Sequence, residues 1–158
     1  MGNKGRAAMS FEIALLHRHP DRVAEIAEGY LAEWPEWYGP GGPGDALADL
    51  TARAAGEGLP LGLIALTEGR AVGACAIAPT SIASYAHLTP WLVGLWTNPP
   101  LRRRGIGAAL IMASRPAAAQ MGYRWLYAAT STAAGLLARD GWSLVATDGG
   151  QAIFSVGV

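Results

Sequence analysis

The stretch Leu101-Arg102-Arg103-Arg104-Gly105-Ile106-Gly107-Ala108-Ala109-Leu110 decides the fold of this chain. An apolar run over residues 91–97 precedes it, Asn98-Pro99-Pro100 interrupts that run, and an alanine-rich segment follows. This order is typical of a strand, a turn and a helix. The two glycines leave the backbone at the start of the helix bare of side chains, so another molecule can approach it closely.

Such a helix start favours an anion. The N–H groups of the first turn have no partner inside the helix, and the helix dipole adds partial positive charge there. A phosphate or pyrophosphate fits this site, and Arg102, Arg103 and Arg104 would strengthen the attraction. A dinucleotide-binding fingerprint is excluded because Leu110 stands where its third glycine belongs, and a P-loop because Gly-Lys-Ser/Thr is missing. A helix start with solvated arginines is the plain structural alternative.

Composition indicates one globular domain. Of 158 residues, 51% are hydrophobic and 15% charged, so we expect a single domain over residues 10–158 after a loose leader over residues 1–9. The formal net charge of +0 gives no support to a nucleic-acid or membrane-surface role. Cys75 is the only cysteine and is expected to be a buried structural thiol, in keeping with a reducing, cytoplasmic location. No apolar run approaches the length of a membrane span.

The rest of the pattern alternates between strands and helices. We expect strands over residues 11–16, 61–67, 71–78, 91–97, 124–129, 144–147 and 153–156. We expect helices over residues 20–34, 46–55 and 105–121, and from Thr130 or Thr132 to residue 140. Pro116 should kink or shorten the third of these helices. The predicted class is α/β, with a mixed, mainly antiparallel central sheet and helices on both faces.

Three segments together resemble the GNAT superfamily of N-acetyltransferases. Arg102-x-x-Gly105-x-Gly107-Ala108 is similar to the coenzyme A pyrophosphate loop of that family. Residues 90–99 look like its fourth strand with the terminal proline. Thr130-x-x-Ala133-x-x-Leu136-Leu137-x-x-x-Gly141-Trp142 looks like its Asn-x-x-Ala-x-x-Leu-Tyr-x-x-x-Gly-Phe segment. The resemblance extends from residue 11 to about residue 156.

The resemblance implies acetyl-CoA as cosubstrate and no metal. In this family pantetheine lies between the splayed fourth and fifth strands, so the backbone of Leu95, Trp96 and Thr97 would bond its amides. A backbone N–H near Leu95 would stabilise the oxyanion of the tetrahedral intermediate. Thr130, at the position of the family's asparagine, could bond the pantetheine arm. The residues implied to hold the pyrophosphate are Arg102, Arg103, Arg104, Gly105, Ile106, Gly107 and Ala108.

The chain departs from the family at the catalytic groups. Leu137 stands where the family has the tyrosine that protonates the leaving thiolate; Tyr127, Tyr123 and Ser131 are candidate replacements. Residues 91–97 contain no carboxylate, so the base must come from elsewhere. The candidates for the base are Glu33, Glu36, Tyr85 and His87, with ordinary solvated loop and helix-end residues as the structural alternative.

An aromatic patch is expected to bind the acceptor. Trp34, Glu36, Trp37 and Tyr38 fall where family members build acceptor contacts, and their rings could attract an ammonium group. Aromatic residues near a helix end most often belong to a core or a dimer contact, which is the structural alternative. A glycine- and proline-rich run over residues 40–44 would let this wall move as a lid.

The predicted function is that of an acetyl-CoA-dependent N-acetyltransferase, an acyltransferase that transfers groups other than amino-acyl groups. It would move the acetyl group directly from the thioester to the primary amine of a small molecule, with catalysis coming mostly from positioning. A coenzyme A-binding module that is catalytically weak or inactive is the alternative, motivated by Leu137. An arginine-mediated nucleic-acid contact is a third hypothesis, against which the zero net charge argues. The resemblance also allows a homodimer.

Overall fold

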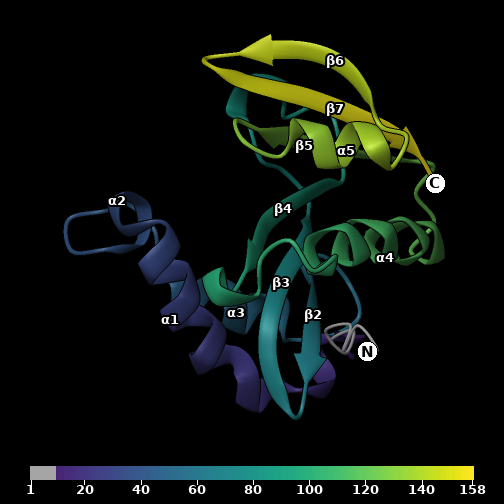
Figure 1. Cartoon of the computed structure of the whole chain (residues 1–158). Coiled ribbons are helices and arrows are strands. Elements are labelled where there is room, and N and C mark those ends of the chain that lie inside the picture. Colours follow the sequence, from purple (N-terminus) through teal and green to yellow (C-terminus); the bar gives the residue numbers. More distant parts are fainter. Residues whose placement is uncertain (1–9) are drawn as a thin grey trace, which may run out of the picture.

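The structure is a computed structural model that describes residues 10–158 (Figure 1). The leader that we predicted over residues 1–9 lies outside the described residues. A seven-stranded sheet runs through the molecule in the order β1-β2-β3-β4-β5-β7-β6. Its strands are β1 (Glu12–Leu15), β2 (Leu61–Thr67), β3 (Arg70–Ala78), β4 (Trp91–Thr97), β5 (Trp125–Thr130), β6 (Ser143–Asp148) and β7 (Gln151–Gly157). Every neighbouring pair is antiparallel except β4 and β5, which are parallel.

Helices cover both faces of the sheet. On one face lie α1 (Val23–Glu33), α3 (Ala46–Arg53) and, at the end of α1, the short α2 (Pro35–Tyr38); on the other lie α4 (Ile106–Gln120) and α5 (Ala134–Arg139) (Figure 1). Short 3-10 turns occupy Leu16–Arg18, Pro20–Arg22, Ala83–Tyr85 and Pro99–Leu101. None of the helices within residues 10–158 has the length and apolar character needed to cross a membrane.

The alternation of side chains along the strands makes two cores. Leu63, Ile77 and Leu126 face α4 and α5, whereas Ile64 and Trp96 face α1 and α3. Both faces of β2 and β3 are buried, because helices lie on each side of them. This burial on both faces explains why the sequence of these strands is continuously apolar and does not alternate with polar residues.

The predicted fold class is confirmed. Asp45 caps α3, because its Oδ1 accepts a hydrogen bond from the N–H of Ala48 at 3.0 Å. Pro35 ends α1 as predicted and also begins α2, where a proline loses no helical hydrogen bond.

Of the two effects expected of Pro116, a kink or a shortening of the helix, the shortening is absent, because α4 continues through it to Gln120. Pro116 is exposed, and the exposed side chain of Met112 marks the same solvent-facing side one turn earlier. Since a proline frees the carbonyl four residues before it, water can satisfy the carbonyl of Met112 on this side.

Candidate active site

The parallel strands β4 and β5 separate soon after they meet. Only Trp91 pairs with Tyr127 and Leu92 with Ala128, although β4 continues to Thr97 and β5 to Thr130. The edge of β4 beyond Leu92 therefore has no β5 partner in the part of the sheet that the structure describes. A strand edge of this kind can accept an extended amide-containing chain.

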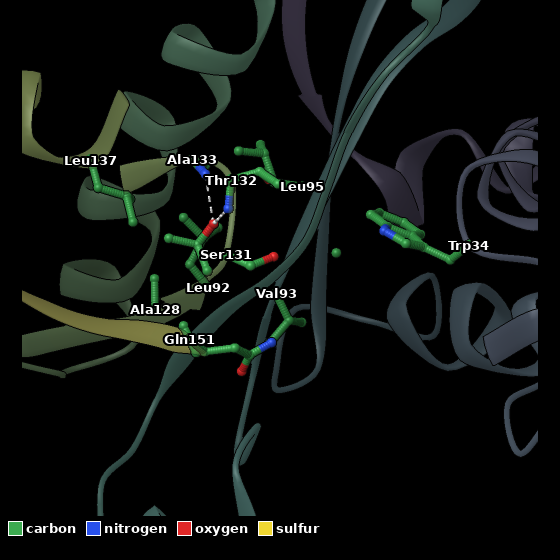
Figure 2. Close-up of a pocket in the computed structure, with 13 residues that line it drawn as sticks. Trp34, Leu92, Val93, Leu95, Ala128, Ser131, Thr132, Ala133, Leu137 and Gln151 are labelled. Atoms are coloured by element: carbon green, nitrogen blue, oxygen red, sulfur yellow. Dashed lines mark hydrogen bonds between the residues drawn. The ribbon is translucent and has the colours of Figure 1, made fainter. Parts of the chain in front are cut away.

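A cavity of about 200 Å³ opens where the two strands separate. Figure 2 shows Trp34, from the end of α1, on one side of it, and Thr132, Ala133 and Leu137 on the other. Backbone groups and small side chains make most of its wall. The lining residues are Trp34, Leu92, Val93, Gly94, Leu95, Ala128, Ala129, Thr130, Ser131, Thr132, Ala133, Leu137 and Gln151.

The glycine turn follows the end of β4. Gly105 is the N-cap of α4, has φ +86°, and no side chain caps this helix end. A Cβ atom at Gly105 would meet nothing within 4 Å, and one at Gly107 would make only ordinary contacts with Leu136 and Thr97. The first amides of α4 are thus open to a ligand, as an anion site requires. The turn does not line the cavity, but it follows the end of β4, whose residues do.

Arg102 is tied to two neighbouring elements. Its Nη2 is 2.5 Å from Oε2 of Glu33, at the end of α1, and its Nε donates to the carbonyl of Thr97, the last residue of β4, at 3.2 Å. Several guanidinium N–H groups remain for an anion after these contacts. Arg103 and Arg104 are exposed on the same turn, and Arg103 has a positive φ of +64°. Together the three arginines give the turn a positive rim.

The predicted aromatic wall divides into two parts. The ring of Trp34 packs edge-on against Tyr30 at 5.0 Å and lines the cavity, while the Tyr38 hydroxyl donates to Asp49 Oδ2 at 2.8 Å. Burial, followed by this carboxylate partner, raises the pKa of Tyr38 to about 12. Trp37 and Glu36 are exposed and do not line the cavity. The structure therefore brings Trp34 alone of this group to the cavity wall.

The candidate catalytic groups lie in three separate places. Glu33 pairs with Arg102, as described. His87 is exposed and stacks on Tyr85 at 6.0 Å in the loop before β4. The ring of Tyr127 packs against Trp91 at 5.6 Å and is absent from the cavity lining. No contact within the described residues joins these three side chains, and their roles stay predictions.

Leu137 and Thr130 do meet at the cavity. Leu137 is buried and lines it, as does Ser131, one of the candidate replacement acids. Thr130 Oγ1 accepts from the N–H groups of Thr132 at 3.1 Å and Ala133 at 2.7 Å, shown as dashed lines in Figure 2. These bonds fix the turn before α5, and the hydroxyl retains its hydrogen to donate to a ligand.

Sequence reasoning missed Gly94 and its partner Tyr30. Gly94 lies inside β4 with φ +62°, and the buried Tyr30 donates from its hydroxyl to the Gly94 carbonyl. An isolated glycine in a strand pattern indicates a bulge, so the sequence alone could have predicted one at Gly94. Tyr30 carried no such signal, because its place in the apolar stripe of α1 is that of an ordinary core residue. Cys75 is a buried thiol as predicted, and burial raises its pKa to about 12.

The chain is similar to known proteins in its sequence pattern and in its fold. A sequence profile described as the Acetyltransferase (GNAT) family matches residues 23–140. No protein of curated function matches in sequence. The fold is similar to that of an aminoglycoside 6'-acetyltransferase type Ii, at 15% identity and a TM-score of 0.74, over 92% of this chain and 96% of that one.

Two further solved structures show the same likeness. A putative acetyltransferase, yncA from Salmonella typhimurium with acetyl-CoA, has 17% identity and a TM-score of 0.72 over 94% of each chain. A polyamine N-acetyltransferase from Drosophila melanogaster has 15% identity and a TM-score of 0.68, and the match covers 94% of this chain and 100% of that one. The splayed strands, the glycine turn and the matched profile agree, and the chain belongs to the GNAT acetyltransferase family.

Proposed function

We propose that this protein transfers an acetyl group from acetyl-CoA to the primary amine of a small molecule. One arrangement carries the proposal. The cavity opens where β4 and β5 separate, and the open start of α4 follows the end of β4. An extended thioester arm would fill the strand gap, and a diphosphate would bind the helix start. Coenzyme A combines these two chemistries, and the described residues fit it.

The backbone would hold most of the cosubstrate. Leu95, Trp96 and Thr97 would bond the pantetheine amides along the free edge of β4, and Thr130 would donate its hydroxyl from the opposite wall. The amides from Gly105 to Ala108 would bind the diphosphate, with the charge of Arg102, Arg103 and Arg104 around it. Acetyl-CoA supplies an activated carbonyl carbon, so the remaining task is to place an amine beside it.

In the transfer itself, the amine nitrogen forms a bond to the acetyl carbon and the carbon–sulfur bond breaks. The nitrogen releases a proton and the sulfur takes one up. An alkylamine must first lose a proton, which costs about 4–5 kcal/mol at pH 7. Glu33 and His87 are our candidates for the base, and Tyr127 for the acid, with Ser131 as the replacement that lines the cavity.

Two observations support the proposal that the acceptor is a small amine. Trp34 lines the cavity and offers an aromatic face to an ammonium group, with Glu36, Trp37 and Tyr38 on the adjoining segment. Several structures with this fold are described as aminoglycoside, polyamine or agmatine N-acetyltransferases. A coupled assay for free thiol, run with pooled aminoglycosides, polyamines and amino acids, tests the proposal. Thiol release that depends on one of these pools is the expected result.

A coenzyme A-binding module without turnover is the second candidate. It is favoured by Leu137, which is buried at the cavity in the position where the resemblance places an acid. Acetyl-CoA binding in calorimetry without thiol release from any pool would support this module. Leu137→Tyr would then be expected to introduce or raise turnover, because it places a phenol in the cavity wall. An unchanged rate would remove the missing acid as the cause.

A further inference from the structure

β4 contains a bulge at the cavity. Ala76 pairs with Val93 and Ala74 with Trp96, so Gly94 and Leu95 together lie opposite the single residue Cys75. Two residues against one is the definition of a β-bulge, and the φ of +62° at Gly94 is the left-handed conformation that glycine favours. Bulges turn the backbone out of the ladder. The peptide between Gly94 and Leu95 is therefore released from pairing with β3 and lines the cavity.

The buried Tyr30 and the half-buried Arg53 fix the direction of this peptide. Tyr30, which is 0% exposed, donates from its hydroxyl to the Gly94 carbonyl at 2.5 Å. Nη1 of Arg53 donates to the same hydroxyl oxygen at 3.3 Å, and the guanidinium lies 5.8 Å from the centre of the Tyr30 ring. A Cβ atom at Gly94 would lie 2.7 Å from the Tyr30 hydroxyl and 2.9 Å from Nη1 of Arg53. The bulge, the phenol and the guanidinium thus fit closely together.

Because the peptide is planar, the direction of the Gly94 carbonyl also fixes the direction of the Leu95 N–H. Within the described residues the cis bonds precede Pro60 and Pro90, so the Gly94–Leu95 bond is trans. In a trans peptide the N–H points opposite to the C=O. The carbonyl faces Tyr30 on the α1 side of the sheet, whereas the Leu95 side chain packs toward the core under α4. The N–H of Leu95 is directed away from Tyr30, toward the side where Leu137 lines the cavity.

We propose that Tyr30 and Arg53 are positioning residues that orient and polarise the Gly94–Leu95 peptide, so that its N–H can stabilise the oxyanion of acetyl transfer. The inference rests on the proposed function and adds residues to its site. Hydrogen bonds in a chain strengthen one another by about 10–30% each. The chain here runs from Arg53 through the Tyr30 hydroxyl to the Gly94 carbonyl, whose peptide ends in the Leu95 N–H.

Neither residue touches the reacting atoms in this account. Burial raises the pKa of Tyr30 above its ordinary range, although the nearby Arg53 lowers it, and the phenol remains a hydrogen-bond donor. Arg53 has no carboxylate within 4.0 Å among residues 10–158, and its guanidinium donates instead to the Tyr30 hydroxyl. A charge-assisted donor of this kind is stronger than a neutral one.

The test is Tyr30→Phe, which retains the ring that packs on Trp34 and Trp96 and removes only the hydroxyl. Removal of an oxyanion donor lowers kcat about 10²–10³-fold, and we expect the loss of its orienting group to lower kcat by about tenfold. The KM for acetyl-CoA should change by less than about twofold, because this N–H acts mainly in the transition state.

A vibrational measurement gives a second readout that needs no acceptor. The thioester carbonyl stretch of bound acetyl-CoA should shift to lower frequency than in water, since a donor at the carbonyl oxygen weakens the double bond. In Tyr30→Phe this shift should shrink, and in Arg53→Met it should shrink by less. The double variant should match Tyr30→Phe, because Arg53 acts through Tyr30 and the two effects are not additive.

Ser114→Ala is the matched control. Ser114 is buried and its hydroxyl also donates to a backbone carbonyl, that of Ile111 at 2.6 Å, but it lies in α4 outside the cavity lining. It should leave both kcat and the carbonyl shift unchanged. If Tyr30→Phe and Arg53→Met both bind acetyl-CoA with the wild-type carbonyl shift, the positioning role is overturned. If the wild-type chain binds no acetyl-CoA, it is the proposed function that fails.

Discussion

The proposed coenzyme side and the proposed acceptor side of this site are built on different principles. The coenzyme side consists of backbone groups from nearly consecutive residues, the edge of β4 and the first turn of α4. The proposed acceptor side consists of side chains from separated segments. Trp34 at the end of α1 and Gln151 on β7 line the cavity, whereas the candidate base His87 lies in the loop before β4, outside the lining. Only the first kind of site is encoded by a short local pattern. We therefore expect recognition of the cosubstrate and choice of the acceptor to respond to different substitutions.

The largest effect is expected where the two sides meet, at the β4 bulge. Gly94→Ala places a Cβ atom against Tyr30 and Arg53 and forces a left-handed φ on alanine. We expect kcat/KM to fall by about 100-fold, as when an oxyanion donor is lost. Steady-state thiol release measures this. Gly56→Ala is the control, because a Cβ atom there meets nothing within 4 Å; equal activity of the two variants would contradict the role of the bulge.

The next effect should be confined to the coenzyme side. Arg102→Glu places a carboxylate opposite Glu33 and removes a cation from the glycine turn. Since a hydrogen bond to a charged group contributes about 1.5–3 kcal/mol, we expect the Kd for coenzyme A to rise tenfold or more, by about that free energy. Isothermal titration measures the change. Arg124→Glu, the same charge change at an exposed residue just before β5, should leave the Kd unaltered. Equal Kd values for both variants would remove Arg102 from the binding site.

A smaller effect is expected on the acceptor side alone. Trp34→Ala removes an aromatic face from the cavity wall, and a cation–π contact contributes about 0.5–2 kcal/mol. The KM for the amine should therefore rise about fivefold, while the Kd for acetyl-CoA stays within about twofold. Trp125→Ala, which removes an exposed indole outside the cavity, is the control. If the Kd for acetyl-CoA rose as much as the KM for the amine, Trp34 would not act on the acceptor side alone.

The smallest effect concerns the stability of the glycine turn without ligand. Gly105→Ala should lower the free energy of unfolding by about 1 kcal/mol, because its φ of +86° strains alanine although the space around it is open. Gly107→Ala should raise it by up to about 1 kcal/mol, since Gly107 lies inside α4 and its Cβ would be accommodated. Denaturant unfolding measures both. Changes of the same sign would show that φ does not govern this turn.

The sequence predicted the strand, turn and helix around the two glycines well, for a physical reason. The glycine turn, the strand before it and the helix after it are local, so the spacing of Gly105 and Gly107 and the Asp45 cap can be recognised without tertiary contacts. The boundaries of most strands and helices followed from apolar periodicity in the same way. Whether Pro116 would kink or shorten α4 could not be decided from the sequence, because solvent exposure, which depends on the fold, decides whether a freed carbonyl is tolerated.

The rest of the site depends on contacts between residues that are far apart in sequence. Tyr30 and Gly94 are 64 residues apart, and Glu33 and Arg102 are 69 apart, so no local pattern joins them. The group of Trp34, Trp37 and Tyr38 could be predicted as a cluster, but only the packing on Tyr30 decides that Trp34 faces the cavity and Trp37 the solvent. Side-chain direction is a tertiary property.

The most direct test compares acetyl-CoA with S-acetylpantetheine, which carries the same thioester arm without the diphosphate, in isothermal titration against the wild-type chain. The amides of the glycine turn should bind the diphosphate, so acetyl-CoA should bind with a Kd at least about 100-fold lower than S-acetylpantetheine, a difference of about 2.7 kcal/mol. Equal Kd values for the two compounds, or no heat with millimolar acetyl-CoA, would contradict the account.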